Sequence, residues 1–223
     1  SAGALLVVDN TFATPALQQP ILLGADLVVH SATKYIGGHG DLVAGAVLGS
    51  KGHIEAIRRE ALRYMTGATM SPFTAFLLLR GLKTLELRMQ RHCASALAVA
   101  RMLEKHPAVD TVFYPGLETS KFHPLAAQQM SAFGGLIAIE LRGGKMAAVR
   151  FINNLTLARR AVSLGDAETL VQHPASMTHA TYSQEERERY GISESLVRIS
   201  VGLETPADIE NDLQEALHAA SKS

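Results

Sequence analysis

The stretch Leu27-Val28-Val29-His30-Ser31-Ala32-Thr33-Lys34-Tyr35 decides the fold of this chain. Its first residues have the composition of a buried strand, and polar residues follow directly where that strand ends. An earlier apolar run, Leu5-Leu6-Val7-Val8, ends in the same way at Asp9. A helix predicted over residues 17–23 connects the two strands, which is the strand–helix–strand pattern of a parallel sheet. The sequence therefore predicts an α/β fold in which Asp9 and Lys34 lie at one edge of a sheet.

Composition and charge exclude several classes of protein. The 223 residues are 47% hydrophobic and 19% charged, which is an ordinary globular mixture. The formal net charge is zero, so the charge favours neither nucleic acid nor an anionic membrane as a partner. No apolar run approaches the roughly 20 residues of a membrane-spanning helix, and the N-terminus lacks a secretory signal pattern. The single cysteine, Cys93, is expected on a buried helix face and suits a reducing compartment, so we predict a cytoplasmic protein.

A single long helix is predicted in the middle of the chain. Ser71-Pro72 is a typical helix start, with a capping hydroxyl followed by proline in the first turn. Helical periodicity then continues over residues 73–105, with Arg80, Lys83 and Arg88 on the predicted solvent side. A helix of this length usually bridges two domains.

The pattern of predicted strands and helices differs on the two sides of that helix. Residues 1–85 are predicted to belong to a large domain, and residues 86–223 are predicted to form a small α/β domain with a partly antiparallel sheet. Periodicity predicts further strands over residues 42–48, 111–114, 136–141 and 197–201, and further helices over residues 51–64, 125–130, 145–154 and from Thr205-Pro206 onward.

Four polar side chains at the predicted sheet edge have the chemistry that binds pyridoxal 5′-phosphate (PLP). The Lys34 amine can form a Schiff base with a carbonyl group, and the Ser31 and Thr33 hydroxyls can donate hydrogen bonds to a phosphate. The Asp9 carboxylate can keep a pyridine nitrogen protonated, so that the ring accepts charge from a carbanion. Taken singly, Asp9 also suits a turn and Ser-x-Thr-Lys also suits a polar loop. Their joint presence on neighbouring loops favours a PLP site.

Other polar residues have competing interpretations. Arg198 interrupts an apolar strand, where its planar fork suits a carboxylate, but an internal ion pair explains the same pattern equally well. The glycine-rich turn at residues 37–41 does not fit G-x-G-x-x-G, and we interpret it as structural. His173 and His179 lack helical spacing and a companion cysteine or carboxylate cluster, so no metal site is predicted.

These stretches together resemble the PLP-dependent enzymes of cysteine and methionine metabolism, the cystathionine γ-synthase/γ-lyase group. The resemblance implies the C-terminal part of an aspartate-aminotransferase-like (fold type I) enzyme, with a large-domain remainder followed by a small α/β domain. It covers the chain from one end to the other and is carried by residues 7–11, 30–35, 163–166, 173–179 and 196–202.

The resemblance also implies a role for each candidate residue. Ser163 and Arg198 would bind the carboxylate of a sulfur amino-acid substrate. Lys34 would be the catalytic Schiff-base lysine. The residues that would hold PLP are Asp9, Ser31, Thr33 and Lys34.

Within the group, residues 38–41 and 64–68 are most similar to methionine γ-lyase. This similarity implies γ-elimination of L-methionine to methanethiol, 2-oxobutyrate and ammonia, in a homotetramer (a dimer of dimers) with active sites at the dimer interface. The alternatives on the same scaffold are cystathionine γ-lyase or γ-synthase and O-acylhomoserine sulfhydrylase. A further alternative is an inactive fragment, because the group carries an additional N-terminal region and this chain opens almost directly into a buried-type strand. We therefore expect the chain to be part of a larger protein.

Overall fold

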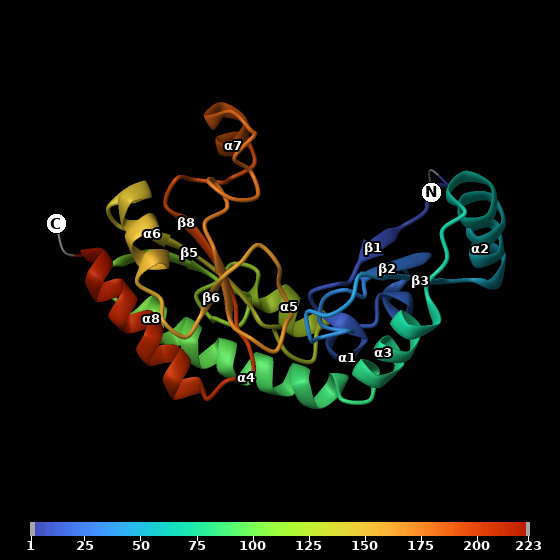
Figure 1. The fold of residues 1–223 in the computed structure, drawn as a ribbon, viewed down its shortest axis with the longest axis horizontal. Helices are drawn as coiled ribbons and strands as arrows, with labels where there is room; N and C mark the ends of the chain where they lie inside the picture. Colours follow the sequence, from blue (N-terminus) through green and yellow to red (C-terminus); the bar gives the residue numbers. More distant parts are fainter. Residues whose placement is uncertain (1–2, 222–223) are drawn as a thin grey trace.

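Two β-sheets lie at opposite ends of the molecule, and the long helix α4 (Leu85–Glu104) passes from one towards the other (Figure 1). The computed structural model describes residues 3–221. The first sheet has the order β1-β2-β3, with β1 at Val7–Asp9, β2 at Leu27–Ser31 and β3 at Gly45–Gly49. β1 and β2 pair in parallel as predicted, whereas β3 runs antiparallel to β2. The predicted α/β class is confirmed.

The connection between β1 and β2 is not the single helix predicted over residues 17–23. It consists of a short helix α1 (Thr14–Leu17) and a separate 3₁₀ turn, η1 (Pro20–Leu23). Proline has no N–H to donate and disfavours helical backbone in the residue before it. Gln19 accordingly has φ −123° and ψ 80°, outside the helical region, and the helix is interrupted there.

The predicted helix 51–64 is confirmed as a helix that begins after the Ser50 cap. The Ser50 side chain accepts a hydrogen bond from the His53 N–H, as capping serines do. The segment is α-helical in α2 (Lys51–Ala56) and continues with π-helical hydrogen bonding in η2 (Ile57–Thr66). Gly67 then ends it with φ +62°, a conformation that glycine adopts without strain.

The predicted long helix is divided into two. Its start is as predicted: Ser71 caps α3 (Pro72–Leu82) by accepting a hydrogen bond from the Thr74 N–H. The helix stops at Lys83-Thr84, and α4 begins at Leu85, because Thr84 has non-helical backbone angles of φ −116° and ψ 8°. The prediction of one continuous helix over 73–105 was therefore wrong, although both halves are helical.

The second sheet is five-stranded, with the order β4-β5-β8-β7-β6. Its pairs are antiparallel except for β6 with β7, which confirms the predicted partly antiparallel sheet. The strands are β4 (Val109–Phe113), β5 (Leu136–Leu141), β6 (Arg159–Arg160), β7 (Leu170–Gln172) and β8 (Leu196–Ser200). The accompanying helices are α5 (His123–Gln129), α6 (Gly144–Asn153), α7 (Gln184–Arg189) and α8 (Pro206–Ser221).

The sequence did not predict β7 or α7, which are both short. α7 projects away from the body of the molecule (Figure 1) and is capped at its start by Ser183 and Glu186, each binding the other's backbone N–H. None of the helices in residues 3–221 combines the length and the apolar character that crossing a membrane would require.

The main hydrophobic core lies between the second sheet and the helices α4, α6 and α8. β5 and β8 contribute alternate residues to it, as expected for strands that bury one face. Its fully buried members include Leu103, Ile139, Phe151, Val197, Ile199, Leu213 and Leu217. Smaller clusters lie around the first sheet, and one of them contains Cys93, which is buried on α4 as predicted.

Candidate active site

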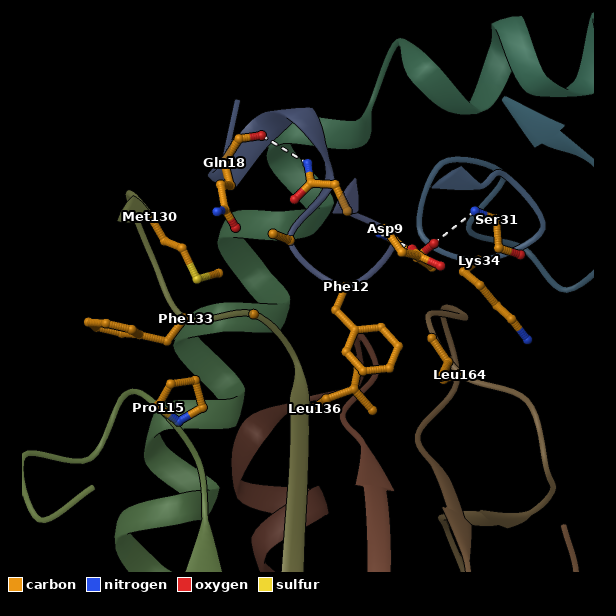
Figure 2. Close-up of a pocket in the computed structure, with 14 residues that line it drawn as sticks. Asp9, Phe12, Gln18, Ser31, Lys34, Pro115, Met130, Phe133, Leu136 and Leu164 are labelled. Carbon is orange, nitrogen blue, oxygen red and sulfur yellow. Dashed lines mark hydrogen bonds between the residues drawn. The ribbon is translucent and has the colours of Figure 1, made fainter. Parts of the chain in front are cut away.

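A cavity of about 630 Å³ opens at the carboxyl ends of β1 and β2, and its size is typical of small-molecule sites. Figure 2 shows Asp9, Ser31 and Lys34 close together at this cavity. Asp9 ends β1, Ser31 ends β2, and Lys34 lies in the turn that follows β2. Much of the remaining wall is apolar and includes Phe12, Pro115, Met130, Phe133, Leu136 and Leu164.

The Lys34 amine points towards a segment that is distant in sequence. Its Nζ donates a hydrogen bond to the Ser163 Oγ over 3.0 Å. Partial burial lowers the pKa of Lys34 from its ordinary value, and the positive charge of Arg198 lowers it further. Both effects favour the neutral amine, which is the form that acts as a nucleophile or a base.

Asp9 and Ser31 each keep a side-chain oxygen available at the cavity. Hydrogen bonds between side chains and backbone N–H groups fix the loops that carry them. Asp9 is exposed, and its Oδ1 accepts a hydrogen bond from the Thr11 N–H at 3.0 Å, so Asp9 does occupy a turn. The Thr11 Oγ1 in turn accepts the Ser31 N–H at 2.8 Å. The Ser31 hydroxyl itself makes no hydrogen bond within residues 3–221 and is available to a ligand.

Thr33 is placed differently from the other predicted cofactor ligands. Its hydroxyl donates to the Ala44 carbonyl oxygen at 3.2 Å and accepts from the Ala44 N–H at 2.9 Å. It lines a smaller neighbouring cavity of about 140 Å³ together with Ser163 and Gly165. Thr33 therefore fastens the turn after β2 to residue 44, and its role in holding phosphate stays a prediction.

Arg198 lies on β8 and meets no carboxylate among the described residues. Its Nη2 donates to the carbonyl oxygens of Val162 and Ser163, each at 2.9 Å. Burial lowers the pKa of Arg198 from its ordinary value. Within residues 3–221 no ion pair involves Arg198, and its Nη1 and Nε make no hydrogen bond. This arrangement favours the interpretation of Arg198 as an anion-binding residue over an internal ion pair.

The loop that carries Ser163 lies against the turn that carries Lys34. Gly165 has φ +73°, and a Cβ at that position would lie 2.8 Å from the Tyr35 backbone nitrogen. The Gly165 N–H donates to the Ser200 Oγ at 2.9 Å, which ties the loop to the end of β8. Glycine at position 165 thus allows residues from the two sheets to meet around the Lys34 amine.

Two buried residues of α4, which sequence reasoning did not assign to the site, contact the Lys34 turn. Arg88 was predicted on the solvent side of its helix, but it is only 6% exposed, so that prediction was wrong. His92 is fully buried, with its ring centroid 5.1 Å from that of Tyr35, and its Nδ1 donates to the Val201 carbonyl oxygen at 2.7 Å. The only sequence signal is their i, i+4 spacing, which places both on one helix face.

The two histidines considered for metal binding have other partners. His173 is buried, and its ring nitrogens contact the Ser176 hydroxyl and the Glu194 carbonyl oxygen. The Nδ1 of His179 contacts the Thr178 hydroxyl. Across residues 3–221, no group of three or more histidine, cysteine, aspartate or glutamate side chains has an arrangement suited to a metal ion.

The class of protein follows from this site together with the match of residues 1–218 to the family described as Cys/Met metabolism PLP-dependent enzymes. The chain belongs to that family, and the predicted family is confirmed. It is 58% identical over 219 residues to the L-methionine gamma-lyase of Pseudomonas putida, covering 98% of this chain and 55% of that protein. It is 46% identical to the O-succinylhomoserine sulfhydrylase of Pseudomonas aeruginosa, covering 97% of this chain and 53% of that protein.

Solved structures agree with the sequence match. A cystathione gamma lyase of Micromonospora echinospora has a TM-score of 0.91 and 44% identity, covering 97% of this chain and 56% of that one. The predicted fold class is confirmed by this similarity. The chain spans about half the length of the curated relatives that it matches.

The residues at the cavity fit PLP by their chemistry. The cofactor needs a covalent amine, an acid for its ring nitrogen and donors for its phosphate. Lys34, Asp9 and Ser31 offer these three groups around one cavity, and the amine and the hydroxyl lack competing carboxylate partners within residues 3–221.

Proposed function

We propose that this chain forms the lysine-bearing part of a PLP-dependent carbon–sulfur lyase that acts on L-methionine. The products are methanethiol, 2-oxobutyrate and ammonia. The observation that carries the proposal is the Lys34 amine, which shares a cavity with Asp9 and Ser31 and donates a hydrogen bond to Ser163. The choice of L-methionine is supported by the 58% identity to a protein named L-methionine gamma-lyase.

PLP, when bound, supplies an electron sink for the negative charge that develops at the substrate's α carbon. Lys34 would hold the cofactor covalently through Nζ. The Asp9 carboxylate would keep a proton on the pyridine nitrogen, and the Ser31 and Thr33 hydroxyls would donate to the phosphate.

The Lys34 amine also moves protons in this proposal. Once the substrate amine has displaced Nζ from its covalent link, the neutral Nζ would accept the proton from the substrate's α carbon. The lowered pKa of Lys34 increases the fraction of amine in that form. The hydrogen bond to Ser163 Oγ orients Nζ between transfers. After passing the α proton on within the site, the same Nζ would remove a proton from the β carbon. That proton would then go to the sulfur, which leaves the γ carbon as methanethiol.

Arg198 would orient the substrate through its carboxylate. The guanidinium is held at Nη2 by two backbone carbonyls, and its Nη1, which makes no hydrogen bond among the described residues, would donate to an oxygen of the carboxylate. A carboxylate fixed in this way aims the Cα–H bond at Lys34, and such alignment is a large part of enzymatic rate enhancement.

Sister reactions on the same scaffold are the nearest competitors, because the chain is also 46% identical to an O-succinylhomoserine sulfhydrylase and 44% identical to a cystathione gamma lyase. The test is to incubate the purified protein with PLP and to compare product release from L-methionine, L-cystathionine and O-succinylhomoserine. Methanethiol as the fastest product supports the proposal. Faster cysteine release from cystathionine, or sulfide-dependent consumption of O-succinylhomoserine, would replace L-methionine as the substrate.

Because the chain spans about half the length of its relatives, a non-catalytic fragment is the second candidate. Two measurements separate it from the enzyme. Borohydride reduction should fix PLP on the peptide that contains Lys34. A chimera in which residues 3–218 replace the matching region of the Pseudomonas putida relative should retain methionine elimination. A chimera that binds PLP on Lys34 but releases no methanethiol would contradict the proposed activity.

The predicted homotetramer and cytoplasmic location belong to the same proposal. Sedimentation analysis of the PLP-loaded protein should give the mass of four copies, and a monomer at micromolar concentration would contradict this prediction. Fractionation of source cells should place the protein with the cytosolic enzymes.

A further inference from the structure

Two backbone carbonyls in the turn that carries Lys34 have no hydrogen-bond donor within that turn. Within the turn, the N–H groups of Lys34, Gly37 and Gly38 donate to the carbonyls of Ser31, Ala32 and Lys34, over 3.1, 2.8 and 2.7 Å. The next two carbonyls, those of Tyr35 and Ile36, accept no backbone hydrogen bond among the described residues. Buried carbonyls generally require a donor, so this turn depends on a group from elsewhere.

Arg88 supplies that donor from α4. Its Nη1 donates to the Tyr35 carbonyl at 2.6 Å, and its Nη2 is 2.8 Å from the Gly81 carbonyl and 3.4 Å from the Ile36 carbonyl. Its Nε donates to the Thr84 Oγ1 at 3.2 Å. Within residues 3–221 Arg88 forms no ion pair, so a buried guanidinium is used entirely on backbone and hydroxyl oxygens.

Two glycines make room for this arrangement. Gly38 has φ +69°, and a Cβ there would overlap the Arg88 guanidinium. A Cβ at Gly81 would lie 2.6 Å from the Ile36 carbonyl oxygen and 2.7 Å from the Gly37 carbonyl oxygen. The close approach of α3, α4 and the Lys34 turn therefore requires a side-chain-free residue at both positions.

We propose that Arg88 is a positioning residue, which fixes the backbone of the Lys34 turn so that the Lys34 amine stays aligned with Ser163 and the cavity. This inference rests on the proposed function, in which Lys34 carries the cofactor and moves the proton. Arg88 does not touch the cavity, so it acts through the backbone of residues 35 and 36. Small displacements of a catalytic group from its working geometry are known to cost about 10²-fold in rate.

The test uses Arg88→Lys and Arg88→Met in the PLP-loaded protein, with Arg101→Met as the matched control. Arg101 is an exposed arginine on the same helix and has no hydrogen bond or ion pair among the described residues. Arg88→Met should lower kcat by about 10²-fold with little change in KM. It should also shift the pH midpoint of the absorbance band of Lys34-bound PLP. Arg88→Lys, which keeps one donor, should recover part of both effects, and Arg101→Met should match the parent.

Hydrogen exchange on the cofactor-free protein separates this inference from the proposed function. Loss of charge-assisted hydrogen bonds to the turn should speed exchange of the Gly37 and Gly38 amides by about tenfold or more in Arg88→Met. If the parent neither binds PLP nor eliminates methanethiol, the proposed function fails and exchange alone decides the role of Arg88. Unchanged exchange in the turn would overturn that role.

Thr84→Val is a second variant that keeps the inference testable if both Arg88 variants fail to fold. It removes the acceptor of the Arg88 Nε and leaves the guanidinium in place. We expect a severalfold fall in kcat and a smaller shift of the absorbance midpoint in the same direction. A folded Thr84→Val or Arg88→Lys protein with parental kcat, parental midpoint and parental exchange in the turn would overturn the proposal.

Discussion

The two sheets differ in how completely this chain covers their apolar residues. In the second sheet, the core-facing residues Ile139, Val197 and Ile199 are fully buried under helices. In the first sheet, Val7 is 53% exposed and Leu48 is 47% exposed. Yet the first sheet carries the residues predicted to hold the cofactor. The local geometry of the candidate site therefore depends on specific polar contacts more than on a large apolar core of its own.

Those polar contacts fix the turn after β2, and two of them connect it to segments beyond the first sheet. Thr33 binds the Ala44 backbone, Lys34 binds Ser163, and Arg88 binds the carbonyls that follow Lys34. The Lys34–Ser163 and Arg88–Tyr35 contacts join groups far apart in sequence, whereas the Thr33–Ala44 contact spans 11 residues. Such contacts set the positions of individual atoms, whereas apolar packing supplies most of the free energy of folding. The comparison predicts that substitutions in the two regions will separate activity from stability.

The largest expected effect is loss of activity without loss of stability in Lys34→Ala. General acid–base catalysis alone contributes about 10²–10⁴-fold, and this variant also loses the covalent link to PLP, so elimination should fall by at least that factor. Methanethiol release and the free energy of unfolding are to be measured together. Lys83→Ala is the matched control, since Lys83 is exposed on the segment between α3 and α4. Activity within tenfold of the parent would remove Lys34 from its proposed role.

In the core of the second sheet, substitutions are expected to lower the free energy of unfolding. Phe151 is fully buried there, so Phe151→Ala should lower the free energy of unfolding by about 3–5 kcal/mol. Leu6→Ala in the first region should change it by only about 0.5 kcal/mol, because Leu6 is 52% exposed. Denaturant unfolding of both variants checks the comparison. Similar losses for the two would mean that the first sheet is better packed than its exposure indicates.

His92 links the two regions, and its titration should be visible in stability. Burial lowers the pKa of His92 to about 4, below its ordinary value of 6.5. The unfolded chain therefore binds a proton at His92 before the folded chain does as the pH falls below 6.5. By linkage, the stability present above pH 6.5 should fall by about 3 kcal/mol on reaching pH 4.

His92→Asn isolates this contribution. The asparagine amide can still donate to the Val201 carbonyl but does not titrate. Unfolding free energies of the parent and the variant are to be compared at several pH values between 7 and 4. The parent should lose about 3 kcal/mol more than the variant over this range. Parallel pH profiles would show that the pKa of His92 is not lowered in the folded protein.

The smallest expected effect concerns Arg198. Arg198→Lys keeps the positive charge but loses the planar fork, so the KM for L-methionine should rise by about tenfold, equivalent to about 1.4 kcal/mol. The absorbance of Lys34-bound PLP should not change, because Arg198 is not placed to hold the cofactor. A normal KM with a lowered melting temperature would instead assign Arg198 a purely structural role.

The sequence alone determined the class of fold and most of the candidate residues. Apolar runs that end in Asp9 and in Ser31-x-Thr33-Lys34 are local patterns, and the chain positions of parallel strands follow from them. The strand at Leu136–Leu141 and the cap at Ser71 were predicted correctly for the same reason. These features depend on side chains close together in sequence, which the pattern records directly.

Only the tertiary structure decided which residues meet around Lys34. The hydrogen bond from Lys34 to Ser163 spans 129 residues, and no local pattern encodes such a contact. The burial of Arg88 was mispredicted because helical periodicity treats a charged residue as solvent-facing, whereas here the backbone carbonyls of a distant turn solvate the guanidinium. The break at Thr84 and the room left by Gly38 belong to the same three-dimensional contact. Local sequence propensity determines where helices and strands form, whereas long-range polar contacts determine which residues meet around Lys34.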